Sequence, residues 1–502
     1  MKEHIPKILI ITPEVTYLPE DSGVLSPYLS AKAGGLADVS AMLIKELFDM
    51  GVDCHVLLPD YRKIYQNQAK HLTALYNEQL MIYMENLCDQ RIHLAQDRSF
   101  YHRNKVYSNY RYENLKVSLA FQREAINNII PMVRPDLVHL NDWMTGLIPA
   151  YLRKKNIPSL FTIHNIHTAT ATLAVIEDNG IDAAEFWECL YYKEYPSSYE
   201  EIREKVEVDF LASGIFASHF VNTVSPTFLK EIVSGYHDFI PSHIRQELIN
   251  KYNAGCAVGI LNAPDASFDP KTDKAIFKNY TPRNMVSGKR ENKLYLQKKL
   301  GLIVDEKAPL FFWPSRLDPI QKGCQLLADI LYEVVSKYWE KHLQIVFVAD
   351  GEYFGVFEGI VKFHGLFDRV CVCHFDEALS RQGFAASDFI LMPSSFEPCG
   401  LPQMIAPKYG SIPVCHDTGG IHDTITHLEP YNNTGNGFLF KHFDSNGLFW
   451  AIDQAMNFYN LPKQIRTKNI MRIMKEANKK FNYKECAKKY IQLYEKMLDR
   501  PL

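Results

Sequence analysis

Short runs of apolar residues alternate with longer amphipathic segments along most of the chain, in two consecutive series. The first series places apolar runs at 8–11, 53–58, 136–140, 159–163 and 220–224. The second series places them at 310–313, 343–348, 370–373, 389–392 and 412–414. Helical patterns over 36–50 and 324–338 lie between the first runs of each series. Continuous apolar runs separated by helix-length segments are typical of buried parallel strands with crossover connections, so the pattern predicts an α/β protein with two parallel sheets.

A change in composition separates the two series. Residues 265–295 are polar, and Asp269–Asp273 leads into a basic stretch that continues to Arg290. A chain of 502 residues is too long for a single hydrophobic core. The sequence therefore predicts two Rossmann-like domains, at 1–265 and 266–480, with a ligand-binding cleft between them.

Composition narrows the class of protein. Hydrophobic residues make up 47% and aromatic residues 12% of the chain, which is ample for large cores. The formal net charge of only -3 favours neither nucleic acid nor an anionic membrane as a partner.

Cysteines and the first residues indicate a compartment. The ten cysteines form no CxxC pair, and Cys371 and Cys373 are too close for an ordinary disulfide or zinc knuckle, so we expect reduced thiols. Pro6 and the short first apolar run argue against a signal peptide, and no run reaches transmembrane length. The sequence predicts a soluble cytoplasmic protein.

The most informative segment is Pro393–Leu401, which contains Glu397 in a turn rich in proline and glycine. It follows an apolar run and precedes a predicted helix. Open α/β sheets bind ligands at this edge, and the N-terminus of a helix offers backbone N–H groups to phosphate. Asp417–Gly420 is a second strand-to-helix turn of this type.

Two further loops carry cations. Ala31–Val39 places Lys32 before Gly34 and Gly35, where glycines allow close backbone approach and positive φ. In Trp313–Gly323, Arg316 and Lys322 have the charges needed to hold a diphosphate. For both loops, ordinary turns with solvated cations remain the alternative.

Polar groups also end two strands of the first series. Thr162–His167 follows one apolar run, and His139–Trp143 ends another. Polar groups beside an aromatic ring suit sugar hydroxyls and ring stacking. Either motif alone is equally consistent with a structural histidine or a helix cap.

Taken in order, these motifs resemble those of one family, the bacterial glycogen synthases and plant starch synthases, which are retaining glucosyltransferases of the GT-B fold. The matching segments are Lys32–Leu36, His139–Trp143, Thr162–Asn165, Thr223–Thr227, Leu261–Ala263, Ser315–Gly323, Phe396–Leu401 and Thr418–Gly420. The resemblance covers nearly the whole chain, and the ordered combination is specific although each motif alone is not. It implies an N-terminal acceptor and catalytic domain at 1–265, completed by a C-terminal helix within 481–502. The nucleotide-sugar-binding domain is then 266–480.

The chain departs from the family pattern at several places. An insertion at about 17–30 precedes the glycine loop, and Arg316 and Lys322 are one residue farther apart than usual. Segment 167–170 replaces the family's Gln-Gly continuation. Three single positions also differ from many relatives: Met144 replaces a polar residue, and Pro402 replaces a threonine. Ile405 stands where related transferases carry a ribose-binding carboxylate, which the synthases lack as well.

The resemblance implies transfer of glucose from ADP-glucose to the non-reducing end of an α-1,4-glucan, with no cofactor and no obligatory metal. The catalytic residues it implies are Glu397, His164, Arg316, Lys322 and Asp142. The substrate-binding residues it implies are Lys32, Gly34, Gly35, Asn165, Phe375, Cys399, Gly400, Leu401, Thr418, Gly419 and Gly420. Among these, Phe375 aligns with the adenine-stacking aromatic, for which a core phenylalanine is the alternative. Cys399 is expected to pack beside the site, because no activating base for a thiol nucleophile is evident.

Two other functions stay open at this point. A related retaining transferase would use UDP-glucose or a small sugar acceptor. A weakly active homologue would bind glucan or nucleotide as a regulator. The sequence does not indicate an oligomeric state.

Overall fold

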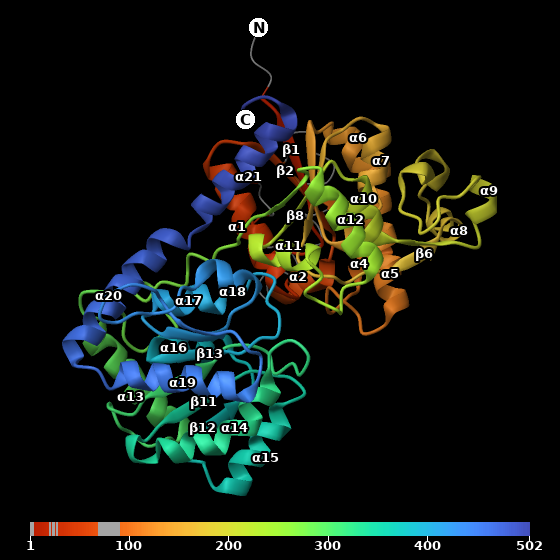
Figure 1. Ribbon diagram of the computed structural model, residues 1–502. Helices are drawn as coiled ribbons and strands as arrows, with labels where there is room; N and C mark the ends of the chain where they lie inside the picture. Colours follow the sequence, from red (N-terminus) through yellow and green to blue (C-terminus); the bar gives the residue numbers. More distant parts are fainter. Residues whose placement is uncertain (1–4, 20–21, 23–25, 27–28, 69–90) are drawn as a thin grey trace. The chain divides into compact units, whose positions relative to one another are not determined.

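The structure is a computed structural model, and it describes residues 5–19, 22, 26, 29–68 and 91–502. The chain forms two compact units (Figure 1). Unit 1 comprises residues 1–224, 229–260 and 483–502, and unit 2 comprises residues 225–228 and 261–482. The predicted roles of the two halves, one for acceptor and one for nucleotide sugar, stay a prediction.

Unit 1 is built on a seven-stranded sheet with the order β3-β2-β1-β4-β5-β8-β9. All neighbouring strands in it are parallel. Its strands are β1 (Lys7–Ile11), β2 (Asp53–Pro59), β3 (Ile92–Ala95), β4 (Leu137–Asn141), β5 (Ser159–Ile163), β8 (Phe220–Thr223) and β9 (Ala257–Gly259). A separate antiparallel pair joins β6 (Thr170–Thr172) to β7 (Glu207–Asp209).

The following helices belong to unit 1, except that residues 226–228 of α11 fall in unit 2. They are α1 (Gly35–Asp49), α2 (Arg62–Gln68), α4 (Arg98–Tyr101), α5 (Arg111–Glu124), α6 (Ile130–Val133), α7 (Ile148–Lys154), α8 (Leu173–Asp178), α9 (Tyr199–Ile202), α10 (Phe210–Ala217), α11 (Pro226–Val233), α12 (Ser242–Asn253) and the C-terminal α21 (Tyr483–Leu498). Figure 1 shows α21 beside α1, although they lie at opposite ends of the chain.

Buried polar contacts fix α21 to the sheet. The ring of His139 on β4 bonds to the Tyr494 hydroxyl at 2.7 Å and to Thr162 Oγ1 at 2.6 Å. Asn222 on β8 donates to the Tyr490 hydroxyl at 3.0 Å. His139 therefore has a structural role: both of its ring nitrogens are occupied in tying a distant helix to two strands.

Unit 2 is built on a six-stranded parallel sheet with the order β12-β11-β10-β13-β14-β15. The strands are β10 (Leu310–Trp313), β11 (Gln344–Val348), β12 (Val370–Cys373), β13 (Phe389–Met392), β14 (Ile412–His416) and β15 (Phe438–Phe440). The helices are α13 (Met285–Leu300), α14 (Cys324–Lys337), α15 (Phe354–His364), α16 (Glu377–Ala386), α17 (Pro402–Lys408), α18 (Gly419–Thr424), α19 (Ser445–Tyr459) and α20 (Lys463–Lys480).

The sheet of unit 2 is buried on both faces. Alternate residues of β10 point to opposite sides, so Phe311 and Trp313 join one apolar cluster while Leu310 and Phe312 join the other. Helices α14, α15 and α19 contribute to the first cluster, and α13, α16 and α17 to the second. Two covered faces explain why these strands are continuous apolar runs in the sequence. The predicted α/β class with two parallel sheets is confirmed.

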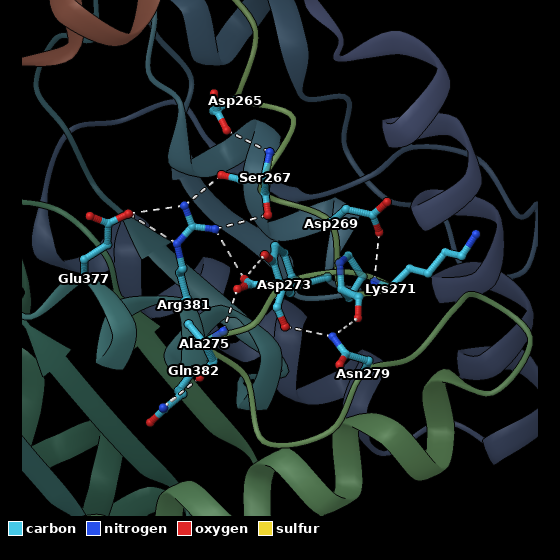
Figure 2. Close-up of polar contacts among 12 residues, drawn as sticks. Asp265, Ser267, Asp269, Lys271, Asp273, Ala275, Asn279, Glu377, Arg381 and Gln382 are labelled. Atoms are coloured by element: carbon cyan, nitrogen blue, oxygen red, sulfur yellow. Dashed lines mark hydrogen bonds and ion pairs between the residues drawn. The ribbon is translucent and has the colours of Figure 1, made fainter. Parts of the chain in front are cut away.

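The segment between β9 and α13 is anchored to α16 of unit 2 through Arg381 (Figure 2). The Arg381 guanidinium donates to the carbonyl and hydroxyl oxygens of Ser267 and to Asp273, and it lies 4.0 Å from the Phe268 ring centre. Asp273 also accepts a hydrogen bond of 2.5 Å from the Tyr409 hydroxyl. A polar stretch of sequence is thus held in place without helix or strand.

No helix in the described ranges combines the length and the apolar character that crossing a bilayer requires.

Candidate active site

The predicted motifs cluster where the strand order of each sheet reverses. This reversal lies between β1 and β4 in unit 1 and between β10 and β13 in unit 2. Ligands of open α/β sheets bind outside the carboxyl ends of the strands at such points. The loops after β1, β4 and β5 carry the motifs of unit 1, and the loops after β10, β13 and β14 carry those of unit 2.

In unit 2, Lys322 and Glu397 meet across the reversal point. The Lys322 amine lies 2.6 Å from Glu397 Oε2, and both side chains are largely buried. The Ser394 hydroxyl donates to the same carboxylate oxygen at 3.1 Å. A buried carboxylate needs such partners, because an unpaired charge away from water is costly.

Backbone contacts join the three loops of unit 2 into one surface. The Ser395 N–H donates to the Gln321 carbonyl at 2.8 Å, and the Gly420 N–H donates to the Glu397 carbonyl at 2.9 Å. Two glycines make this close packing possible. A Cβ on Gly323, whose φ is +66°, would lie 1.9 Å from the Pro393 carbonyl oxygen, and one on Gly420 would lie 2.0 Å from the Cys399 carbonyl oxygen.

The other predicted residues of unit 2 occupy different settings. Thr418, Gly419 and Cys399 are buried in the joined loops, and Gly400 and Leu401 complete the turn before α17. Arg316 is exposed. Within the part of the chain that the structure describes, it forms no ion pair, so only Lys322 of the two predicted cations contacts Glu397. Phe375 is 59% exposed in the turn after β12, an open position for a stacking ring.

In unit 1, Asp142 organises the ends of β4 and β5. Its carboxylate accepts the His164 N–H at 2.7 Å and the Asn165 side-chain amide at 3.1 Å. The His164 ring in turn bonds through Nε2 to Asn141 Oδ1 at 3.0 Å. Asp142 has a positive φ of 58°, a rare conformation for a residue with a side chain, and it is buried.

Burial determines the protonation of Asp142 and His164. It raises the pKa of Asp142 to about 7, although the hydrogen bonds from His164 and Asn165 act in the opposite direction. Burial also lowers the pKa of His164 to about 3, so the imidazole is neutral near pH 7. The turn therefore contains a neutral histidine beside a carboxyl group that titrates near neutrality.

The glycine loop of unit 1 is held by a residue that the motifs did not indicate. Glu14 is 2% exposed, and its Oε2 accepts the N–H groups of Ala33 at 2.6 Å and Gly34 at 3.0 Å. Burial raises its pKa, and the loop amides partly offset this effect. The sequence shows Glu14 only as a carboxylate three residues after a strand. Because it lies in no recognisable motif, the sequence did not indicate its role.

One expectation for this loop is wrong in detail. Gly34 is extended, with φ −153°, and neither Gly34 nor Gly35 has a positive φ. The space beside both glycines is open, because a Cβ on either of them would meet nothing within 4 Å. The exposed Lys32 lies 2.9 Å from Asp38.

The structure shows the surroundings of several positions at which the chain departs from the family pattern. Of the insertion at 17–30, residues 20–21, 23–25 and 27–28 lie outside the described residues. The His167 ring packs edge-on to Trp143 at 5.4 Å, and Thr168 donates to Asp209. Met144 is buried. Segment 167–170 is thus tied to neighbouring elements of unit 1.

Comparison with known proteins agrees with this architecture. Residues 7–243 match the starch synthase catalytic domain, and residues 301–472 match the glycosyl transferases group 1. A glycogen synthase of Alkaliphilus metalliredigens is 32% identical over 489 residues, 92% of this chain and 96% of that protein. One of Clostridioides difficile is 32% identical, covering 93% of this chain and 97% of the relative.

Solved structures show the same fold. The catalytic domain of starch synthase IV from Arabidopsis thaliana, bound to ADP and acarbose, has a TM-score of 0.75 at 24% identity, covering 99% of this chain and 100% of that one. A sucrose-phosphate synthase of Thermosynechococcus elongatus has a TM-score of 0.57 at 16% identity, covering 98% and 99%.

The two parallel sheets and their strand-end motifs define a glycosyltransferase of the GT-B fold. Within that class, the chain belongs to the glycogen synthase and starch synthase family.

Proposed function

We propose that the protein is a cytoplasmic glycogen synthase that transfers glucose from ADP-glucose to the non-reducing end of an α-1,4-glucan with retention of configuration. The observation that carries this proposal is the contact between Lys322 and Glu397, two family-motif residues that lie 75 positions apart in the chain and meet at the strand reversal of unit 2. The cytoplasmic part of the proposal rests on the cysteine spacing, since the ten cysteines form no CxxC pair.

In unit 2, the proposed task is to stabilise departure of the diphosphate. Loss of ADP leaves positive charge on the sugar and adds negative charge to the leaving group, so fixed cations and N–H groups lower the barrier. Lys322 supplies the charge next to the joined loops, with Thr418, Gly419 and Gly420 as phosphate-side backbone. Arg316 is an exposed second cation that can turn toward the diphosphate. Glu397 holds sugar hydroxyls and favours the cationic sugar.

In unit 1, the proposed task is to position sugar. Asp142, with its bonds to His164 and Asn165, fixes a polar turn for glucose hydroxyls. The neutral His164 adds no positive charge that would oppose the developing sugar cation. Lys32, Gly34 and Gly35 offer an open loop to the donor. These contributions need no metal ion, since amine and N–H groups act as the electrophiles.

The direct test measures transfer from radiolabelled ADP-glucose and UDP-glucose to glycogen and to maltotriose. We expect label to enter both acceptors, and to enter faster from ADP-glucose. Faster transfer from UDP-glucose would replace the proposed donor. Absence of transfer from both donors, with binding of ADP or glycogen retained, would favour a regulatory homologue.

A further inference from the structure

A cavity of about 620 Å³ lies in unit 2, and of the motifs of the proposed active site only Asp417, the first residue of the Asp417–Gly420 turn, lines it. Its wall is formed by Asp417 after β14, His427 after α18, the end of β15 with the residues that follow it, and the first turns of α19. Asp417 directly precedes the Thr418 turn, whereas none of the other lining residues belongs to a motif of the proposed active site. The volume is within the range of roughly 300–1,000 Å³ that is typical of ligand pockets.

Two aromatic rings form an apolar surface in this cavity. Trp450 of α19 is 47% exposed, unusual for so large a side chain, and its ring lies 5.8 Å from that of His427 with an interplanar angle of 24°. The His427 Nδ1 accepts the Leu439 N–H at 3.3 Å. In a neutral ring this leaves Nε2 as a hydrogen-bond donor. A flat surface with a polar edge is thus held open to solvent.

The polar groups around these rings favour a neutral ligand that is rich in hydroxyls. Two carboxylates, Asp417 and Asp444, line the cavity together with one lysine, Lys441. This balance disfavours a polyanion such as a nucleotide. Among the described residues, neither the Lys441 amine nor the Asn446 amide forms a side-chain hydrogen bond or ion pair, so both are available to a ligand.

We propose that this cavity binds a segment of α-1,4-glucan, with glucose rings stacked on Trp450 and hydroxyl groups bonded to Asn446 and Lys441. The proposal rests on the proposed function, which makes a glucan the substrate. A second place of attachment on the same polymer raises the effective concentration of chain ends near the enzyme. The cavity would therefore help to keep long glucan acceptors bound to the enzyme.

Native gel electrophoresis with and without glycogen in the gel tests the site. The Trp450→Ala variant should lose about tenfold in glycogen affinity, the effect of removing one aromatic anchor, while Trp450→Phe should retain most of it. Trp339→Ala is the matched control, because Trp339 is similarly exposed at 41% but packs on Arg369 and does not line the cavity. Asn446→Ala changes an exposed residue and should weaken retention without affecting folding.

The proposed function is tested by a separate assay, which measures transfer of glucose from ADP-glucose to maltotriose by the wild-type protein. Retention that depends on Trp450 supports the site even if no glucose is transferred. Equal retention of the wild-type protein and Trp450→Ala overturns it, as does equal loss in Trp339→Ala or a wild-type protein that glycogen does not retard.

Discussion

At the scale of single residues, the reactive character of the proposed site comes from burial combined with specific partners. Glu397 is 6% exposed and has both Lys322 and Ser394 as hydrogen-bond donors. An ordinary surface glutamate would be solvated and mobile. Here the carboxylate is fixed before any substrate binds, which is the preorganisation that electrostatic catalysis requires.

We expect Glu397→Gln to lower kcat by about 100-fold or more, the scale of loss for one transition-state electrostatic partner. The amide has the same shape but no charge, so ADP affinity should change far less. Initial rates and calorimetric titration with ADP measure the two effects. Glu358→Gln, on the exposed face of α15, should leave both unchanged. Near-wild-type turnover of Glu397→Gln would remove this residue from the mechanism.

Asp142 gives a prediction about pH. Because its folded-state pKa is raised from 3.8 to about 7, the carboxylate that accepts from His164 and Asn165 becomes fully ionised only above neutrality. We expect kcat/KM to rise as the pH increases through about 7, and Asp142→Asn to flatten this rise. The stability contribution has the opposite sign: it is full below pH 3.8 and is lost as the pH rises through about 7. An unchanged pH profile in Asp142→Asn would assign the titration to another group.

The sequence placed the candidate residues at strand ends but did not predict their contacts; their assignment to the site stays a prediction. Strand-end motifs indicated Glu397, Lys322, Asp142 and His164, because parallel strands bring their carboxyl ends to one edge. It gave no sign that Lys322, rather than Arg316, would contact Glu397. Glu14 was missed because a single carboxylate has meaning only when the loop amides it accepts from are known.

At the scale of elements, length and burial decided which predictions succeeded. The central strands were placed within about two residues, since each is a continuous apolar run buried on both faces. Short strands were missed: β3, β9 and β15, and the pair β6 and β7. The four-residue strands β10 and β13 were found because they are fully apolar and buried. Most of the missed strands lack such a run: β6 and β7 are largely polar, β3 contains His93, and β9 ends in glycine, whereas β15 is apolar but has only three residues.

The anchor shown in Figure 2 predicts an unequal effect of two neighbouring substitutions on α16. Arg381→Ala leaves the buried Asp273 without its cation, so the free energy of unfolding should fall by about 3 kcal/mol or more. Glu377→Ala removes the exposed partner of the same arginine and should cost about 0–1 kcal/mol. Urea unfolding of both variants measures the difference. Equal effects would mean that the segment around Asp273 is not held by Arg381.

At the scale of the whole molecule, the chain passes between the units at 260–261 and at 482–483, besides the short excursion of residues 225–228 into unit 2. Unit 1 therefore includes α21, which follows unit 2 in the sequence. The hydrogen bond between the His139 ring and Tyr494 depends on α21, as does the one from the Asn222 side-chain amide to Tyr490. Without α21, these buried polar groups and an apolar surface would lie open to water.

We expect truncation after Asn482 to prevent stable folding of unit 1, measured as soluble yield and resistance to proteolysis. Removal of residues 499–502 alone should have little effect, since it deletes the surface pair between Arg500 and Asp136 and two long hydrogen bonds to Glu495. A soluble truncation at Asn482 with wild-type protease resistance would contradict the structural role of α21.

The central claim is retaining transfer of glucose from ADP-glucose to the end of an α-1,4-glucan. The most direct measurement incubates the protein with ADP-glucose carrying an isotope at its anomeric carbon and with maltotriose, and follows the product by NMR. We expect the label to appear at the non-reducing end in an α-1,4 linkage. A β-linked product, or labelled free glucose as the only product, would contradict it.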